Sequence, residues 1–336
     1  MRASLLLLVG CIAAVGTAQA PLPTLNPHTT TTTGISAGAA FAVQYQFAFS
    51  STIHAAGIIA GLPYYCAQGE MAYAFECMDS PYLINLGTLL ADVNYLATTG
   101  KIDPVSNLAK QRIMLFSGTQ DSIVNPLAMK MLASMYQQLN ATHVTTYFNY
   151  SAEHAWITNY YGNACDYKGS PYINNCGLDF AGAFLKDAFA GMGLAWNATR
   201  GVYNPGNMRT WDISSFGASS SISLASTAYI YVPAQCAPGG AKAGRCHLHI
   251  NFHGCTQSAS NFFLDPTKYV AHTGLNEWAE SNDVVVFYPQ NEANPLLENP
   301  EGCFDWWGYA GANYPTKEGA QMAVIRAAAQ SLVGGQ

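Results

Sequence analysis

Two kinds of segment alternate along the first half of the chain. Short runs of apolar or β-branched residues, bounded by Gly, Pro or polar positions, predict strands at residues 29–33, 54–62, 112–117 and 144–150. Longer segments rich in apolar residues predict helices at 39–49 and 126–139. A strand, a helix and a second strand in succession form a parallel crossover unit, so this half favours an α/β fold with a mostly parallel sheet flanked by helices.

The second half begins with a polar stretch. Residues 201–225 are rich in Gly, Ser and Asn. Strands are then predicted at 228–232, 247–252 and 283–288, and a helix at 319–332. We therefore expect one α/β domain over 21–336, with 201–225 as a long surface connection; two separate domains are the alternative.

The first twenty residues predict a secretory signal peptide over 1–20. Arg2 is positively charged, residues 5–15 are apolar, and Ala18-Gln19-Ala20 is a small-residue cleavage site. A lipobox at Leu8–Cys11 is the alternative, although it would leave a short apolar core. No other stretch has the roughly 18 to 20 apolar residues of a membrane span. The sequence thus predicts a secreted, extracellular protein with no membrane partner.

Composition narrows the class of protein. Half of the 336 residues are hydrophobic and only 10% are charged, which excludes intrinsic disorder. The net charge is −6 and no basic stripe is present, so we expect no nucleic-acid partner. A monomer is expected.

The cysteines indicate disulfides. Nine are present, and excluding Cys11 leaves eight, an even number in an oxidising compartment. No C-x-x-C pair occurs, which argues against zinc and against thioredoxin-like redox chemistry. We expect no metal and no cofactor. Eight cysteines allow 105 pairings. Short-loop closure favours Cys66–Cys77, Cys165–Cys176 and Cys236–Cys246, which leaves Cys255–Cys303. Sequons at Asn140, Asn149 and Asn197 would carry glycans if the source is a eukaryote.

Residues Gly34-Ile35-Ser36-Ala37-Gly38 match G-x-S-x-G, the pattern of a nucleophile elbow. The pattern follows a Thr-rich strand and opens an apolar helix, which is the context in which such a serine is exposed above the strand ends. The N–H of Ala37 then faces the oxygen that becomes negative during acyl transfer. A plain structural turn is the alternative.

A serine nucleophile needs a base and an acid, and in this fold class they follow it in the order acid, then histidine. Asp121 comes just after the strand at 112–117, and His154 comes just after the strand at 144–150. The carboxyl ends of parallel strands share one edge of the sheet. We therefore expect Asp121 as the acid and His154 as the base, while His143 lies before its strand, on the wrong side.

A second motif is Phe252-His253-Gly254-Cys255, at the end of the strand 247–252. A His-Gly turn after a strand commonly supplies a second oxyanion N–H in α/β hydrolases. The histidines at 247, 249 and 253 could instead bind zinc, but no fourth ligand converges on them. We interpret them as metal-free.

The order of the motifs is unusual for an α/β hydrolase. Several strands and the oxyanion loop normally precede the nucleophile, but residues 21–35 are too few to hold them. The missing strands come near the C-terminus instead. A circularly permuted sheet explains this order, because domain termini lie at the surface and often close together.

An aromatic cluster, Cys303-Phe304-Asp305-Trp306-Trp307, surrounds an acid beside a cysteine. It predicts either a packed core under a loop or the apolar wall of a substrate pocket. Asp305 and Glu301 are rival acids for the histidine, but both come after it in the chain.

Together these residues resemble the fungal single-domain poly(3-hydroxybutyrate) depolymerase family. The shared features are the N-terminal elbow, G-x-x-D, a late histidine, H-G-C-x-Q and G-C-[FW]-D-W-x-G, in the same order over nearly the whole mature chain. The resemblance implies a Ser36, His154 and Asp121 triad. It also implies Ala37 and Cys255 N–H groups as the oxyanion hole, and Trp306 as a substrate contact.

The chain departs from the family pattern at Ala37, Ala39 and Phe304, and the last of these changes the pocket shape. No polymer-binding module follows the last predicted helix, so adsorption is expected on the catalytic domain itself. The sequence predicts an extracellular polyester hydrolase without cofactor. A carboxylesterase for small or plant-wall esters, such as feruloyl or acetyl groups, uses the same residues and is the first alternative. A catalytically dead binding or adhesion protein is the second.

Overall fold

A computed structural model describes residues 21–259, 265 and 267–333. The predicted signal peptide at 1–20, with Cys11, lies outside these residues. In the described part, eight strands form one sheet in the order β4-β3-β2-β1-β10-β11-β9-β8. β9 runs in the opposite direction to the other seven strands of this sheet, which is thus mostly parallel. The strands are β1 (Thr30–Ile35), β2 (Ile53–Ile59), β3 (Arg112–Phe116), β4 (His143–Tyr147), β8 (Met208–Asp212), β9 (Thr227–Tyr231), β10 (His247–Phe252) and β11 (Val284–Tyr288).

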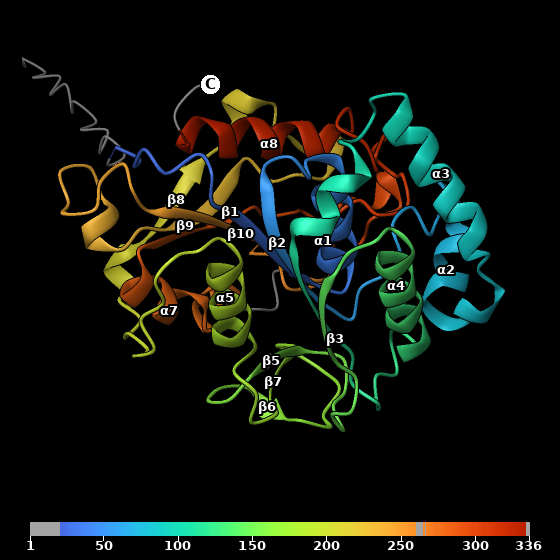
Figure 1. The fold of residues 1–336 in the computed structure, drawn as a ribbon, viewed down its shortest axis with the longest axis horizontal. Coiled ribbons are helices and arrows are strands. Elements are labelled where there is room, and N and C mark those ends of the chain that lie inside the picture. The colour runs from blue at the N-terminus through green and yellow to red at the C-terminus, as the bar shows by residue number, and fades with distance from the viewer. Residues whose placement is uncertain (1–20, 260–264, 266, 334–336) are drawn as a thin grey trace, which may run out of the picture.

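Helices lie on both sides of this sheet. In Figure 1, α8 runs along its upper side, and α5 and α7 lie below it. A small second sheet has the order β5-β7-β6. The helices are α1 (Ala37–Ala48), α2 (Met71–Asp79), α3 (Leu86–Thr98), α4 (Pro126–Gln138), α5 (Phe180–Gly191), α6 (Lys268–His272), α7 (Leu275–Asn282) and α8 (Ala320–Leu332), and the short strands are β5 (Trp156–Thr158), β6 (Asn163–Ala164) and β7 (Ile173–Asn175).

The centre of the molecule is β1 with the helix that follows it. All residues of β1 and all 12 of α1 are buried. A helix that is apolar nearly all round belongs inside a protein. Its two glutamines are satisfied there, since Gln44 Nε2 donates to the Asp305 carbonyl and Gln46 Nε2 to Gln111 Oε1. The alanines of α1 allow the helix to lie close against the sheet.

The expected strands and helices are present, with three differences. β2 ends at Ile59 rather than at residue 62. β4 ends at Tyr147 rather than at residue 150, so His154 lies in a loop that leads to β5. The polar stretch 201–225 is not only a surface connection, because it contains β8, an edge strand in which only Trp211 is buried. His143 is the first residue of β4, at the opposite end of that strand from the loop carrying His154.

The two halves of the chain meet at the centre of the sheet. β1 pairs with β2 on one side and with β10 on the other, both in parallel. The N–H of Leu25 donates to the carbonyl of Leu332, the last residue of α8, at 2.7 Å. The beginning and the end of the described chain are therefore in direct contact, as a circular permutation requires.

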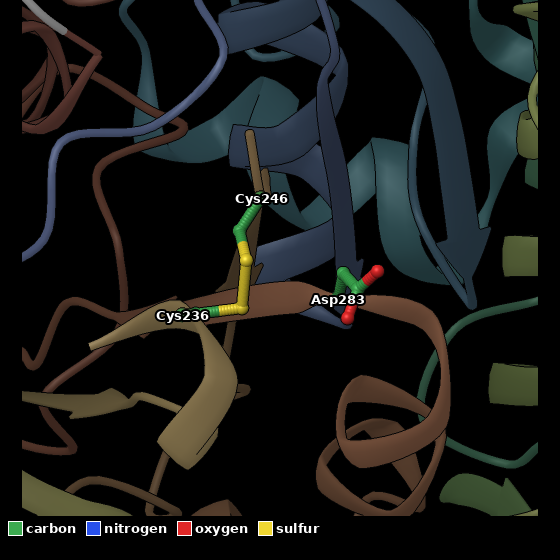
Figure 2. A group of neighbouring side chains, drawn as sticks. All are labelled: Cys236, Cys246 and Asp283. Atoms are coloured by element: carbon green, nitrogen blue, oxygen red, sulfur yellow. A yellow bond between two sulfur atoms is a disulfide. The ribbon is translucent and has the colours of Figure 1, made fainter. Parts of the chain in front are cut away.

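Four disulfides close the loops: Cys66–Cys77, Cys165–Cys176, Cys236–Cys246 and Cys255–Cys303. These are the pairs that the spacing favours. Figure 2 shows Cys236–Cys246 beside Asp283; since the two sulfurs are bonded to each other, they offer no thiolate to a metal. Within the described ranges, each helix is too short or too polar to cross a lipid bilayer.

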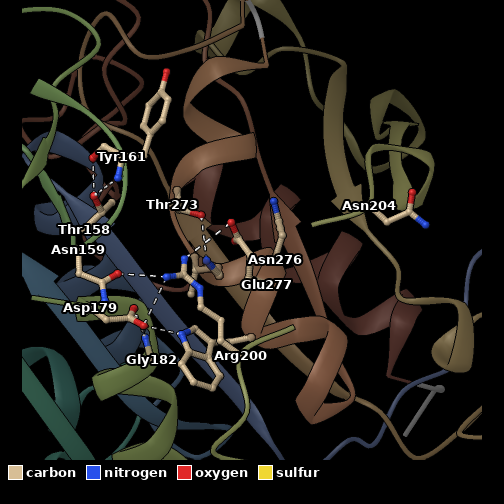
Figure 3. Close-up of polar contacts among 12 residues, drawn as sticks. Thr158, Asn159, Tyr161, Asp179, Gly182, Arg200, Asn204, Thr273, Asn276 and Glu277 are labelled. Carbon is tan, nitrogen blue, oxygen red and sulfur yellow. Dashed lines mark hydrogen bonds and ion pairs between the residues drawn. The ribbon is translucent and has the colours of Figure 1, made fainter. Parts of the chain in front are cut away.

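A cluster of charged and aromatic side chains joins α5, α7 and the loop after β5 (Figure 3). Arg200 is at its centre. Its guanidinium donates to Asn159 Oδ1 at 3.1 Å and lies 3.9 Å from Asp179 and 3.7 Å from Glu277. It also covers the ring of Tyr160 at 4.0 Å. Burial raises the pKa of Glu277, and the Arg200 charge opposes that rise.

Candidate active site

Ser36 lies at the sharp turn between β1 and α1. Its backbone has φ 57° and ψ −127°, a conformation that a non-glycine residue adopts only under strain. The turn requires the flanking glycines, because a Cβ on Gly34 would lie 2.3 Å from the Gly38 carbonyl oxygen. A Cβ on Gly38 would lie 2.2 Å from the His253 carbonyl oxygen. The elbow is thus packed directly against the turn that follows β10.

Asp121 and His154 form a buried hydrogen-bonded pair. His154 Nδ1 lies 2.9 Å from Asp121 Oδ2 and 3.1 Å from Oδ1. Asp121 Oδ1 also accepts the N–H groups of Ile123 and Val124, which hold the carboxylate in place. Asp121 is 8% exposed and His154 4%. With Nδ1 engaged, Nε2 is the ring nitrogen left for proton transfer.

One cavity of about 350 Å³ brings five of the predicted site residues together. Ser36, Ala37, His154, Cys255 and Trp306 all line it. Most of the remaining wall is apolar, and a cleft of this character is typical of small-molecule sites. Its further lining includes Leu62, Met71, Ala74, Met78, Ile123, Val124, Tyr172 and Trp307.

The turn after β10 forms the wall opposite the elbow. A Cβ on Gly254 would lie 3.2 Å from Ser36 Cβ, so the turn and the nucleophile are in contact. The Cys255–Cys303 disulfide ties this turn to the aromatic cluster. The N–H of Thr256 donates to the Glu301 carbonyl at 2.8 Å and makes a second connection between the same two segments.

Asp305 supports the aromatic wall rather than the histidine. Its carboxylate accepts the N–H groups of Gly308, Tyr309 and Ala310 at 2.7 to 3.2 Å. Burial raises its pKa to about 6, against the opposing effect of these hydrogen bonds. Of the three acids considered, Asp121 is the one bonded to His154. Glu301, the other rival, is exposed at the pocket.

The strand histidines are bound to threonine hydroxyls. His249 Nδ1 and Nε2 each lie 2.8 Å from an Oγ1, of Thr31 and Thr33 respectively, and burial lowers the pKa of His249 to about 3. His247 Nδ1 lies 2.8 Å from Thr29 Oγ1. Both nitrogens of His249 are therefore occupied by the neighbouring strand, and this side chain has no free lone pair for zinc.

Three further residues support the site, and two of them, Tyr172 and Glu153, carry no recognisable sequence signal. Tyr172 lines the pocket, and its ring contacts His154 edge-on at 6.4 Å. Glu153 Oε2 accepts the N–H groups of His154 and Ser122, and so joins the loops of the base and the acid. Gln257 Oε1 accepts the Gly254 N–H at 2.7 Å. Gln257 is the last residue of the H-G-C-x-Q motif.

The chain is similar to known proteins over nearly its whole length. No protein-family model matches the chain. It is 39% identical over 310 residues to the poly(3-hydroxybutyrate) depolymerase of Delftia acidovorans; the match covers 91% of this chain but only 60% of that protein's length. It is 32% identical over 352 residues to the polyhydroxybutyrate depolymerase of Talaromyces funiculosus, with 97% of each chain covered.

Solved structures show the same architecture. The crystal structure of PHB depolymerase from Penicillium funiculosum superposes with a TM-score of 0.84 at 30% identity. A PHB depolymerase with a serine-to-alanine substitution, complexed with an R3HB trimer, superposes with a TM-score of 0.84 at 31% identity. Each comparison covers 95% of this chain and 100% of the other.

Proposed function

The chain belongs to the poly(3-hydroxybutyrate) depolymerase family and is a carboxylic ester hydrolase, and on this premise we propose that Ser36, His154 and Asp121 hydrolyse poly(3-hydroxybutyrate) or a related short-chain polyester. The observation that carries the assignment is the Asp121–His154 pair at 2.9 Å, whose histidine lines the same cavity as the strained Ser36. A turn without catalytic use would not need this strain beside a buried imidazole–carboxylate pair.

The mechanism follows from the donors and acceptors present. His154 Nε2 takes the hydroxyl proton of Ser36 while Oγ attacks the ester carbonyl carbon. The carbonyl oxygen becomes negative and is held by the N–H groups of Ala37 and Cys255. The C–O bond breaks, and the alcohol leaves with the proton from His154. Water then enters, loses a proton to His154 and attacks the acyl carbon. The bond between this carbon and Ser36 Oγ breaks, Oγ takes the proton back from His154, and the hydroxyacid is released. Asp121 keeps the Nδ1 proton in place throughout.

The pocket suits an aliphatic ester. The α2 side chains Met71, Ala74 and Met78 line one side, and Trp306 and Trp307 line another. Both tryptophans are less than 10% exposed, so they form a fixed wall. A polymer built from hydroxybutyrate units presents methyl groups and methylene groups to such a wall and one carbonyl per unit to the oxyanion donors. Trp306 is the proposed substrate contact.

Exposed apolar side chains of α2 and of the segment just after it offer a surface for the solid polymer. Tyr73 and Phe75 are 44% and 56% exposed, and Tyr82 and Leu83 just beyond the helix are 71% and 57% exposed. The inner face of the same helix lines the pocket. Contiguous exposed apolar side chains mark interaction sites. We expect Phe75→Ser to reduce binding to a polyester film and to leave soluble-ester turnover unchanged, with Val202→Ser, exposed elsewhere, as the matched control.

The decisive experiment is release of 3-hydroxybutyrate and its oligomers from the polymer by purified protein, with Ser36→Ala as the control. We expect the variant to fold and to lose nearly all turnover. Undiminished hydrolysis by Ser36→Ala would refute the assignment. Preferential turnover of aryl acetates over amorphous film would indicate a small-ester carboxylesterase. No fluorophosphonate adduct on Ser36 would indicate a binding protein.

We further propose that the chain is secreted and that residues 21–336 form one catalytic domain. Four disulfides support an oxidising compartment. N-terminal sequencing of the protein from its source should begin at Pro21. Asn140, Asn149 and Asn197 are exposed, and a mass shift on treatment with a glycosidase would reveal glycans there. An intact Met1 would contradict secretion by cleavage.

A further inference from the structure

The peptide unit between Gly254 and Cys255 has a special place in the proposed mechanism. Its N–H, on Cys255, is one of the two proposed oxyanion donors. Its carbonyl, on Gly254, belongs to the same planar trans unit and therefore points in the opposite direction. Any group that fixes the direction of the Gly254 carbonyl also fixes the direction of the Cys255 N–H.

His253 contacts this carbonyl through its side chain. Its Nδ1 lies 2.7 Å from the Gly254 oxygen. On the other side of the ring, Nε2 lies 3.1 Å from the backbone N–H of Asn291, which can only donate. Nε2 must then carry the lone pair and Nδ1 the proton, so the imidazole donates to the Gly254 carbonyl. The backbone of Asn291 thereby selects the tautomer of His253.

The ring is held rigidly in this orientation. His253 is 1% exposed, and its ring lies 4.7 Å from that of Phe304 and 6.3 Å from that of Tyr269. Burial lowers the pKa of His253 to about 4. The ring is consequently neutral near pH 7, and it has one proton, which is on Nδ1.

The neighbouring N–H groups of the turn have acceptors of their own. The N–H of Gly254 donates to Gln257 Oε1 at 2.7 Å, and that of Thr256 donates to the Glu301 carbonyl at 2.8 Å. The N–H of Gln257 lies 3.3 Å from the Gly254 oxygen and restrains that carbonyl further. Among residues 254–257, the N–H of Cys255 is the one without an acceptor in the described part of the chain, and Cys255 lines the pocket.

We propose that His253 is a positioning residue of the oxyanion hole: its Nδ1–H holds the Gly254 carbonyl and so directs the Cys255 N–H at the substrate oxygen. His253 does not touch the substrate; it acts through the peptide unit. The inference rests on the proposed esterase function, and it assigns to the H-G-C-x-Q histidine a role different from that of His154. The second proposed donor, Ala37, is independent of His253, so loss of His253 should weaken the hole without abolishing it.

Two amide substitutions separate the two ring nitrogens. An asparagine amide can place its NH₂ near the position of Nδ1, whereas the longer glutamine reaches the position of Nε2. His253→Asn therefore keeps the donor to Gly254, and His253→Gln removes it at similar polarity. Complete loss of one oxyanion donor costs about 10²–10³ in kcat. We expect His253→Gln to lose about 10- to 100-fold in kcat on a soluble ester with KM little changed, and His253→Asn to stay within about fivefold of the wild type.

The measurements are chosen so that a merely structural effect is visible. kcat is calculated per active site, and the active sites are counted from the burst of product in the first turnover. Misfolded protein therefore does not lower the measured kcat. If His253→Gln changed only KM, or only lowered the number of titratable active sites, the proposal would be overturned. Equal kcat in His253→Gln and the wild type, or equal losses in the two variants, would also overturn it.

A measurement on the wild-type protein needs no substitution. The ¹⁵N chemical shifts of the His253 ring should show a protonated Nδ1 and an unprotonated Nε2 from about pH 6 to pH 8. The opposite tautomer would overturn the proposal. A fluorophosphonate adduct on wild-type Ser36 together with unchanged variants would refute this inference alone. The absence of that adduct would refute the proposed function and the inference with it.

Discussion

Asp305 offers a quantitative test of how burial affects a charge in this fold. The carboxyl group is 2% exposed, and no lysine or arginine forms an ion pair with it in the part of the chain that the structure describes. Three backbone N–H groups, of Gly308, Tyr309 and Ala310, donate to it. Burial favours the neutral acid and the N–H groups favour the anion; burial has the larger effect, and the pKa rises from 3.8 to about 6.

The sign of the pH dependence follows from this rise. Between pH 3.8 and about 6 the folded protein holds a proton that the unfolded chain has lost, so the free energy of unfolding falls as the pH rises through this range. At about 1.4 kcal/mol per pKa unit, the contribution is about 3 kcal/mol. It is fully present below the unfolded value and is lost above the folded one.

Asp305→Asn isolates this contribution, because the amide has nearly the same shape, keeps an oxygen acceptor and does not titrate. We expect the stability of the wild type, relative to Asp305→Asn, to decrease by about 2 kcal/mol from pH 4 to pH 7. Urea unfolding followed by tryptophan fluorescence, with disulfides intact, measures the difference at each pH. A difference that is constant with pH, or that moves in favour of the wild type as pH rises, would show that the N–H groups outweigh burial.

Three further predictions address the triad, the disulfides and the charged cluster. Asp121→Asn should lower kcat by about 10⁴ near neutral pH, because the amide stabilises the wrong tautomer of His154. The urea midpoint should stay nearly unchanged, since the amide oxygen can still accept the Ile123 and Val124 N–H groups. A loss in kcat below tenfold would contradict the role of Asp121. Replacing Cys255 and Cys303 together by serine should destabilise the protein by about 4 kcal/mol and lower kcat. The matched double variant at Cys236 and Cys246 should lose about 3 kcal/mol of stability without an effect on kcat, since the two disulfides span 48 and 10 residues. Equal kcat in both double variants would show that the Cys255–Cys303 disulfide does not support the oxyanion turn. Arg200→Met should destabilise the protein by about 2 kcal/mol, because Asp179 and Glu277 lose their counter-charge (Figure 3). The kcat per active site, counted by titration, should not change. An unchanged urea midpoint would show that the Arg200 cluster contributes no stability.

Local pattern predicts the centre of this fold well and its periphery poorly. β1, β2, β3, β10 and β11 are buried strands, so their apolar or β-branched runs are continuous and visible in the sequence. β8 is an edge strand of mixed polarity in a Ser-rich region, and its assignment depends on pairing with β9. The pattern does not predict α2 and α3 either, each of which has only two buried residues.

The site divides in the same way. Ser36 belongs to a local motif, and chain order together with the parallel sheet places Asp121 and His154 at the same edge. Glu153 acts through hydrogen bonds to backbone N–H groups, one of them in another loop, and a backbone donor leaves no signal in the sequence. Gln257 is visible only as the last residue of the H-G-C-x-Q motif, which does not reveal its hydrogen bond to Gly254. Tyr172 lies in a loop whose path depends on the small sheet. Such residues could be found only once the loops were placed.

The permuted order also explains why so much of the site's support lies far from Ser36 in the sequence. β1 is the first strand of the described chain, and its neighbour β10 comes from the C-terminal third. The nucleophile and the proposed oxyanion turn are joined across this strand pair, with Gly38 against His253 and Gly254 against Ser36. The beginning and the end of the described chain are in contact, through the hydrogen bond from the Leu25 N–H to the Leu332 carbonyl. A chain opened in the loop between α1 and β2, with the segments at Leu25 and Leu332 linked, would separate α1 from β2 but keep β1 beside β10. Ser36 must stay continuous with α1, so a cut at 36–37 should abolish activity. A cut at the exposed residue Ser51, in the loop before β2, should be tolerated.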